Sequence, residues 1–168
     1  MRVAVTGTPG TGKTTATDRL ETDLPVVHLN DLIREEDLST RVDEERDSLV
    51  ADLEAVEARL ADREDVVVES HLAHHLDVDR VIVLRCAPAV LESRLEERGE
   101  PAATARENAE SEALDVILGE AVTAHGREAV YEVDTTDRAP AAVAREIDRA
   151  IAGERDPSAG TVDYTDYL

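Results

Sequence analysis

A glycine-rich segment near the amino terminus carries residue types whose spacing suits phosphate chemistry. Residues 7–14, Gly-Thr-Pro-Gly-Thr-Gly-Lys-Thr, fit the pattern Gly-x-x-x-x-Gly-Lys-[Ser/Thr] of a phosphate-binding P-loop. Its glycines let the main chain fold tightly, so that backbone N–H groups face phosphate oxygens with no Cβ atoms between them. An apolar run, Val3–Val5, precedes the segment, and a predicted helix follows with its positive end toward the same anion. We therefore predict a nucleotide polyphosphate site here.

Two side chains of this segment have distinct expected roles. Lys13 can reach the β- and γ-phosphates as a point charge, and the hydroxyl of Thr14 is the expected ligand for the Mg²⁺ that bridges them. Lys13 is the only lysine among 18 basic residues. An arginine would be bulkier and differently directed in a close-fitting loop. The residues expected to bind ATP in this segment are Gly10, Thr11, Gly12, Lys13, Thr14 and Thr15.

A second group of polar residues follows the short β-branched run Val66–Val68, which we predict to be a buried strand. Glu69 stands at its end and is the candidate for a second Mg²⁺-associated acid. His71 is the candidate for an imidazole in the same site. His74 and His75 come next, but no further Cys or His stands at a zinc-ligand spacing, so a zinc cluster is not expected.

Short apolar strands alternate with helices along the chain, which predicts an α/β fold with a five-stranded parallel sheet. The predicted strands are Val3–Val5, Val26–Leu29, Val66–Val68, Val81–Leu84 and Ala129–Val133. The predicted helices are Thr14–Leu24, Leu32–Asp37, Leu49–Arg63, Pro88–Arg98, Arg106–Ala124 and Ala141–Ile151. Ser39–Asp47 is expected to be a loop, Glu100–Thr104 a mobile connection, and residues 153–168 a disordered acidic tail after a domain of residues 1–152.

Such a sheet binds ligands at the carboxyl ends of its strands. The segments that fall at these ends are Thr6–Thr14, Glu69–His71, Arg85 and Asp134–Asp137. We expect them to surround one site.

The charge of the chain excludes some classes of partner. With 39 acidic and 18 basic residues the net charge is −21, which argues against general binding of nucleic acids or anionic membranes. The acid is spread along the chain, and the near absence of lysine resembles proteins adapted to molar salt, where charge repulsion is screened. An acidic face for a protein partner is the alternative.

Cysteine usage and hydropathy indicate the compartment. Cys86 is the single cysteine, which excludes an internal disulfide and fits a reducing environment. We find no signal peptide, and no apolar run approaches the roughly 18 residues of a membrane-spanning helix. We expect a cytoplasmic protein without a membrane partner.

With these residues identified, the chain resembles the nucleoside monophosphate kinases, and among them the atypical adenylate kinases linked to small-subunit ribosome assembly. The likeness extends from the first strand to about Ala124. Besides the P-loop and residues 66–71, it is carried by residues 30–36, Asn-Asp-Leu-Ile-Arg-Glu-Glu, followed by Asp43-Glu44-Glu45, and by residues 83–85 with 92–99. Many relatives carry Asp-x-His-Gly where this chain has Glu69-Ser70-His71-Leu72.

The resemblance implies a three-layer P-loop NTPase fold, with an arm near residues 28–51 that binds the monophosphate and a short lid near 97–107. It implies that Asp31 and Arg34 bind the acceptor and that Arg98 grips the donor nucleotide, with residues 134–137 near its base. The implied catalytic residues are Lys13, Glu69, His71 and Arg98, and the implied metal ligands for Mg²⁺ are Thr14 and Glu69.

The implied activity is transfer of the ATP γ-phosphate to AMP or other nucleoside monophosphates, with a side ATPase activity. The implied partners are a small-subunit platform ribosomal protein and the pre-ribosomal particle, with a role in 30S subunit and 16S rRNA maturation. Two alternatives stay open. One is an ATP-hydrolysing assembly switch with little kinase role, and the other is a P-loop kinase for a small metabolite.

Overall fold

The protein is described from a computed structural model, which covers the backbone of residues 1–43 and 48–168 and the side chains of residues 1–39 and 51–168. Five parallel strands form the central sheet in the order β2-β5-β1-β6-β7. They are β1 (Arg2–Thr6), β2 (Val26–His28), β5 (Val66–Glu69), β6 (Arg80–Arg85) and β7 (Val130–Asp134). Strand β1 lies at the centre because both β5 and β6 pair with it.

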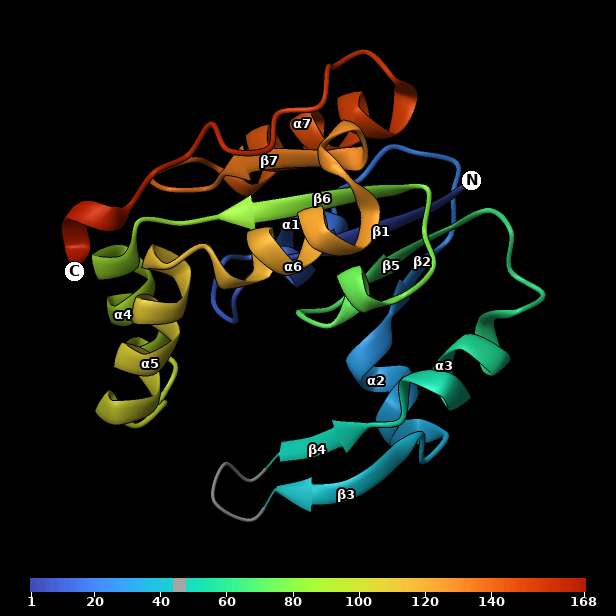
Figure 1. Ribbon diagram of the computed structural model, residues 1–168, viewed down its shortest axis with the longest axis horizontal. Coiled ribbons are helices and arrows are strands. Elements are labelled where there is room, and N and C mark those ends of the chain that lie inside the picture. The colour runs from blue at the N-terminus through green and yellow to red at the C-terminus, as the bar shows by residue number, and fades with distance from the viewer. Residues whose placement is uncertain (44–47) are drawn as a thin grey trace.

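Helices cover both faces of this sheet and make three layers (Figure 1). On one face pack α2 (Leu29–Glu35), α3 (Leu53–Leu60) and α6 (Val116–His125). On the other face pack α1 (Lys13–Thr17) and α7 (Pro140–Ala152). Strands β5 and β6 are buried on both sides, which explains why they are apolar runs without alternation. The α/β fold with five parallel strands is confirmed.

Two further helices form a hairpin beside the carboxyl end of β6 (Figure 1). They are α4 (Pro88–Glu97) and α5 (Ala102–Ala113), which pack around Cys86, Leu91, Leu95 and Ala105. The prediction of a mobile connection at residues 100–104 is wrong, because α5 begins within this segment. The single helix expected over residues 106–124 is also wrong. Asp115 has a left-handed backbone with a φ of 55°, which ends α5 and redirects the chain into α6.

The segment after α2 departs most from the expected elements. The expected loop at residues 39–47 contains β3 (Ser39–Asp43), which pairs antiparallel with β4 (Ser48–Ala51). A helix was expected from Leu49, but α3 begins only after Asp52, whose carboxylate caps it by accepting the Ala55 N–H at 3.1 Å. The ladder with β3 satisfies the backbone of residues 48–51, so it competes successfully with the helical spacing of the leucines. Residues 44–47, which include part of the string used for the resemblance, lie outside the described residues.

Helix α1 is shorter than the expected Thr14–Leu24. The hydroxyl of Thr17 donates to the carbonyls of Lys13 and Thr14 at 2.9 and 3.1 Å. Threonine hydroxyls that bond back to the preceding turn weaken a helix. The chain therefore leaves the helix at Asp18 and continues in turns toward Pro25.

The carboxyl-terminal segment is ordered, and the expectation of a disordered tail is wrong. Its backbone runs along β7, where Ser158 donates its N–H to the Val130 carbonyl at 3.0 Å. It then ends in η3 (Thr165–Tyr167). Two further short helices are η1 (Ala73–His75) and η2 (Arg127–Ala129). Within the described residues, every helix is too short or too polar to cross a membrane.

Candidate active site

The glycine-rich segment forms a tight loop between β1 and α1. Gly10 and Gly12 have φ angles of 93° and 92°, a left-handed conformation that other residues rarely adopt. A Cβ atom on Gly10 would also lie 2.8 Å from Leu91 Cδ1 and 2.9 Å from Leu95 Cδ2. The loop therefore packs directly against α4, and this close approach requires glycine.

Lys13 lies beneath this loop with only 8% of its surface exposed. Its ammonium donates to the carbonyls of Gly7 at 2.9 Å and Thr8 at 3.2 Å. Burial lowers the pKa of Lys13 to about 8, although the negative charge of Glu69 acts in the opposite direction. A buried cation held by neutral carbonyls is stabilised by any anion that enters the loop.

Glu69 connects three elements at the carboxyl edge of the sheet. The register of β5 against β1 and β2 places it beside Val5 and His28. Its Oε1 accepts a hydrogen bond from the Thr14 hydroxyl at 2.7 Å and lies 3.0 Å from His28 Nδ1. The other ring nitrogen of His28 lies 3.3 Å from Asp18. The two predicted magnesium ligands, Thr14 and Glu69, are thus adjacent, and His28 is a neighbour that the sequence did not indicate.

His71 lies near the same edge and is partly buried. Burial, together with the positive charge of Lys13, lowers its pKa to about 4. The imidazole is therefore neutral at pH 7 and can donate or accept a hydrogen bond without carrying a charge.

A cavity of about 700 Å³ opens at this edge. It is lined by residues 9–16 of the loop and α1, by Glu69 and His71, and by Arg98. All the residues predicted to bind ATP and all the predicted catalytic residues therefore surround one space. Asp31 and Arg34 are both exposed, and neither is among the described residues that line the cavity.

Three further lining residues, Asn30, Glu97 and Thr135, belong to segments that were expected at the site. Four lining residues were not assigned to the site from the sequence, namely Arg94, Arg138, Pro140 and Val143. Arg94 stands four residues before Arg98, so the two share one face of α4. That spacing was a usable signal. Arg138 directly follows the segment Asp134–Asp137 that was expected at the site, so its position in the chain was also a usable signal.

Comparisons with known proteins show the family to which the chain belongs. Residues 3–115 match the family described as "AAA domain" (AAA_18). A protein of Natronomonas pharaonis named "Putative adenylate kinase" is 67% identical over the full length of both chains. A protein of the same name from Halobacterium salinarum is 62% identical, again over both full lengths. The chain belongs to this adenylate kinase family. The family resemblance seen in the sequence is thereby confirmed.

The fold is shared more widely than the family. A solved deoxyadenosine kinase from M. mycoides with bound dATP has a TM-score of 0.54 and 15% identity, and the match covers 90% of this chain and 100% of that one. At this identity the likeness concerns the fold. It supports the arrangement of sheet, loop and helices within which this family member builds its cavity.

Arg85 was expected at the site, but it forms a network of ion pairs inside the protein instead. Arg85 is 1% exposed and does not line the cavity. Its guanidinium donates to Glu112, to Asp115 at 2.5 Å and to Glu132 at 2.6 Å. Burial acts to lower the pKa of Arg85, but the three carboxylates outweigh it and raise the pKa. The residue joins β6 to α5, α6 and β7 from inside the protein.

Proposed function

We propose that the protein is a nucleoside monophosphate kinase of the adenylate kinase type, which transfers the γ-phosphate of ATP to AMP. The observation that carries the proposal is the buried ammonium of Lys13 beneath the glycine-rich loop, at one end of a cavity that three arginines line. The names of the relatives from N. pharaonis and H. salinarum support it. Phosphoryl transfer depends mainly on positioning and charge neutralisation, and this set of groups can provide both.

The residues of the loop would bind the donor. Backbone N–H groups of residues 10–15 and the ammonium of Lys13 hold the β- and γ-phosphates. Arg94, Arg98 and Arg138 line the cavity and can neutralise the negative charge that spreads over the transferred phosphoryl group. Neutral His71 would orient a phosphate or a water molecule by hydrogen bonding, since it carries no charge at pH 7.

Thr14 and Glu69 suit a magnesium ion. Mg²⁺ prefers oxygen ligands and is bound through few protein groups plus substrate phosphates. The hydroxyl of Thr14 and the carboxylate of Glu69 are 2.7 Å apart and both line the cavity. These two residues would hold the ion, which when bound neutralises phosphate charge. The side chain of Glu69 is one methylene longer than the Asp of many relatives, so it reaches further from β5.

The acceptor would be bound by the arm near residues 28–51 and enclosed by the lid near 97–107. Asn30 lines the cavity, and Arg34 follows it by four residues on α2, which places both on one helical face. We propose that Arg34, with Asp31, binds the acceptor phosphate after the arm moves toward the cavity. Closure excludes water, which would otherwise accept the phosphoryl group and produce ATPase activity.

A screen of all nucleoside monophosphates as acceptors tests the proposal. ATP, Mg²⁺ and each monophosphate are supplied at several KCl concentrations, with a reaction lacking acceptor to measure hydrolysis. We expect ADP from ATP plus AMP at a rate well above hydrolysis. A small hydroxylated metabolite such as shikimate serves as the contrasting acceptor. Hydrolysis without transfer at every salt concentration would contradict the kinase proposal and favour the ATP-hydrolysing switch.

Arg34→Ala separates acceptor binding from donor binding. We expect the KM for AMP to rise at least tenfold, as loss of about 1.4 kcal/mol or more requires, while the KM for ATP stays unchanged. Arg145→Ala is the matched control, because Arg145 is an exposed arginine of α7. An equal rise of both KM values would assign Arg34 to general stability.

We extend the proposal to ribosome assembly. The net charge of −21 complements basic ribosomal proteins, and the family resemblance supports a small-subunit platform protein as the partner. Stimulation of ATP hydrolysis by such a protein, lost in the presence of excess AMP, would support this role. Absence of binding at every KCl concentration tested, from dilute buffer to molar salt, would contradict this role.

A further inference from the structure

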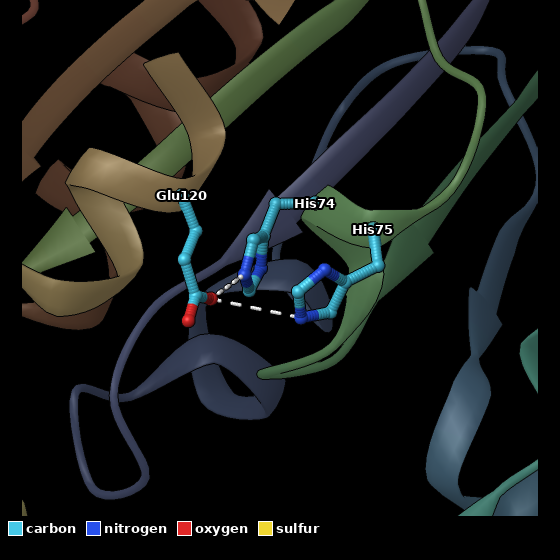
Figure 2. Close-up of side chains that lie close together, drawn as sticks. All are labelled: His74, His75 and Glu120. Atoms are coloured by element: carbon cyan, nitrogen blue, oxygen red, sulfur yellow. Dashed lines mark hydrogen bonds and ion pairs between the residues drawn. The ribbon is translucent and has the colours of Figure 1, made fainter. Parts of the chain in front are cut away.

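A cluster of three metal-ligating side chains lies outside the cavity. His74 and His75 belong to η1, and Glu120 projects from α6. Figure 2 shows one carboxylate oxygen of Glu120 facing both imidazole rings. That oxygen lies 2.7 Å from His74 Nε2 and 3.6 Å from His75 Nε2, and one ligand atom of each residue lies within 4.8 Å of the others. None of the three lines the cavity described above.

We propose that His74, His75 and Glu120 bind a divalent transition-metal ion of the Zn²⁺ type. Two imidazole nitrogens and one carboxylate oxygen are the donors that zinc binds tetrahedrally at about 2.0–2.2 Å. Tetrahedral ligand atoms at such bond lengths are about 3.3 Å apart. The distances of 2.7 and 3.6 Å from the Glu120 oxygen lie on either side of this value. Rotation of His75, whose side chain is 36% exposed, can shorten its separation from His74.

The buried member of the cluster is oriented from behind. His74 is 1% exposed, and its Nδ1 lies 2.8 Å from the Thr6 hydroxyl. When Nε2 binds a metal, Nδ1 carries the proton and donates it to this hydroxyl oxygen. Such a bond behind a ligating histidine determines its tautomer and orientation. His125 donates to the backbone carbonyl of His74 at 2.8 Å, which fixes the main chain of η1 as well.

The remaining features of the site are those of an ion that also contacts solvent. The side chain of Glu120 is 46% exposed, so a water molecule can reach the fourth coordination position. Imidazole donors favour zinc, copper or nickel over magnesium, which separates this site chemically from Thr14 and Glu69. The net charge of −21 raises the local concentration of any cation.

The bound ion would link η1 to α6. Thr6 is the last residue of β1, directly before Gly7 of the glycine-rich loop. A metal on His74 therefore acts on the strand that carries the loop through one hydrogen bond. We assign the ion a structural role, because it stabilises the connection between β5 and β6 rather than contacting a substrate.

Without a metal, the His74 and Glu120 pair alone would be an ordinary hydrogen bond. A metal site requires His75 as a ligand, whereas a hydrogen bond between His74 and Glu120 does not. The test uses the full-length protein, stripped with a chelator and kept in excess Mg²⁺ so that hard-oxygen sites stay saturated. Co²⁺ is titrated and its visible absorption recorded, and Zn²⁺ is then added to displace it.

We expect one Co²⁺ per chain with the intense absorption of a tetrahedral site, displaced by one equivalent of Zn²⁺. His75→Gln and Glu120→Gln should each weaken Zn²⁺ binding by at least about tenfold. Glu128→Gln is the matched control, an exposed carboxylate on the neighbouring η2. Circular dichroism serves to check that each variant is folded. Octahedral Co²⁺ spectra, or wild-type Zn²⁺ affinity in the double variant of His75 and Glu120, would overturn the proposal.

Discussion

Two cations lie buried near the carboxyl edge of adjacent strands, and their surroundings are opposite. Lys13 follows β1, and within the described part of the chain its ammonium forms no ion pair and donates to two backbone carbonyls. Arg85 ends β6, and its guanidinium contacts three carboxylates. The pKa of Lys13 is lowered to about 8 by burial. The pKa of Arg85 is raised, because its carboxylate partners outweigh its burial.

The difference separates the proposed binding residue, Lys13, from a structural one, Arg85. A buried charge without a counter-ion costs free energy, and an incoming anion removes that cost. A cation already surrounded by carboxylates is not stabilised further by an incoming anion. On the proposed function, the glycine-rich loop keeps Lys13 available to bind phosphate, while the Arg85 network joins β6, β7, α5 and α6. The following predictions test this division.

Arg85→Met should have the largest effect on stability. Removing the guanidinium leaves Glu112 and Glu132 buried without their ion-pair partner, and breaking a buried ion pair costs about 3–5 kcal/mol. Urea unfolding at a constant molar KCl concentration measures the change. Arg145→Met on the exposed face of α7 is the control and should stay within about 0.5 kcal/mol. A loss below about 1 kcal/mol in Arg85→Met would contradict the structural role.

Lys13→Met should behave in the opposite way. Turnover should fall about 10²–10³-fold, the effect of removing one preorganised group that stabilises transition-state charge. The free energy of unfolding should stay equal or rise, because methionine fills the same space without a charge to compensate. Parallel measurements of phosphoryl transfer and urea unfolding check both statements. Wild-type turnover in this variant would refute the proposed site.

Gly10→Ala disturbs the loop around Lys13 while leaving every charge in place. The added Cβ would meet Leu91 and Leu95 at under 3 Å, and overpacking of this kind costs about 1–3 kcal/mol. Gly99→Ala is the matched control, since Gly99 has a similar φ of 91° with no atom within 4 Å of the added Cβ. We expect Gly10→Ala to lower the thermal midpoint more than Gly99→Ala. Equal shifts would show that the side chains of Leu91 and Leu95 can move aside without a loss of stability.

The smallest predicted effect concerns Tyr164, which lies beside the Arg85 network. Its ring lies 5.8 Å from the Arg85 guanidinium carbon, and its hydroxyl donates to Asp134 at 2.6 Å. Burial and this hydrogen bond raise the pKa of Tyr164 to about 12. The contact therefore contributes stability below pH 10 that is lost as the pH rises from about 10 to 12.

The phenolate absorbance of wild type minus that of Tyr164→Phe measures this titration. We expect a difference curve with its midpoint near pH 12. A midpoint near the ordinary value of 10 would show that the carboxyl-terminal segment leaves Asp134 in solution.

Local sequence was enough for the centre of the fold and for one half of the site. The glycine spacing of residues 7–14 specifies a loop whose geometry depends on neighbours in the chain, and the apolar run before Glu69 specifies a strand that ends at the same edge. The contacts of His28 with Glu69 and Asp18 could not be predicted, because they join it to residues on separate segments of the chain. The role of Arg34 stays a prediction.

Elements that depend on long-range contacts were predicted least well. Asp115 interrupts an alanine-rich helical stretch by adopting a left-handed backbone, which the composition of that stretch does not reveal. The last residues are polar enough to be disordered, yet Thr161 donates its N–H to Glu132 at 2.7 Å. Its partner lies on β7, so this order depends on the assembled sheet.

The sequence by itself determined the glycine-rich loop, its single lysine and the parallel sheet, because glycine freedom and apolar patterning act over a few neighbouring residues. The tertiary structure alone decided that Arg85 is enclosed by carboxylates and that Glu120 faces His74 and His75. Those contacts join residues 27 to 47 positions apart, and only the packed sheet and its helices bring them together.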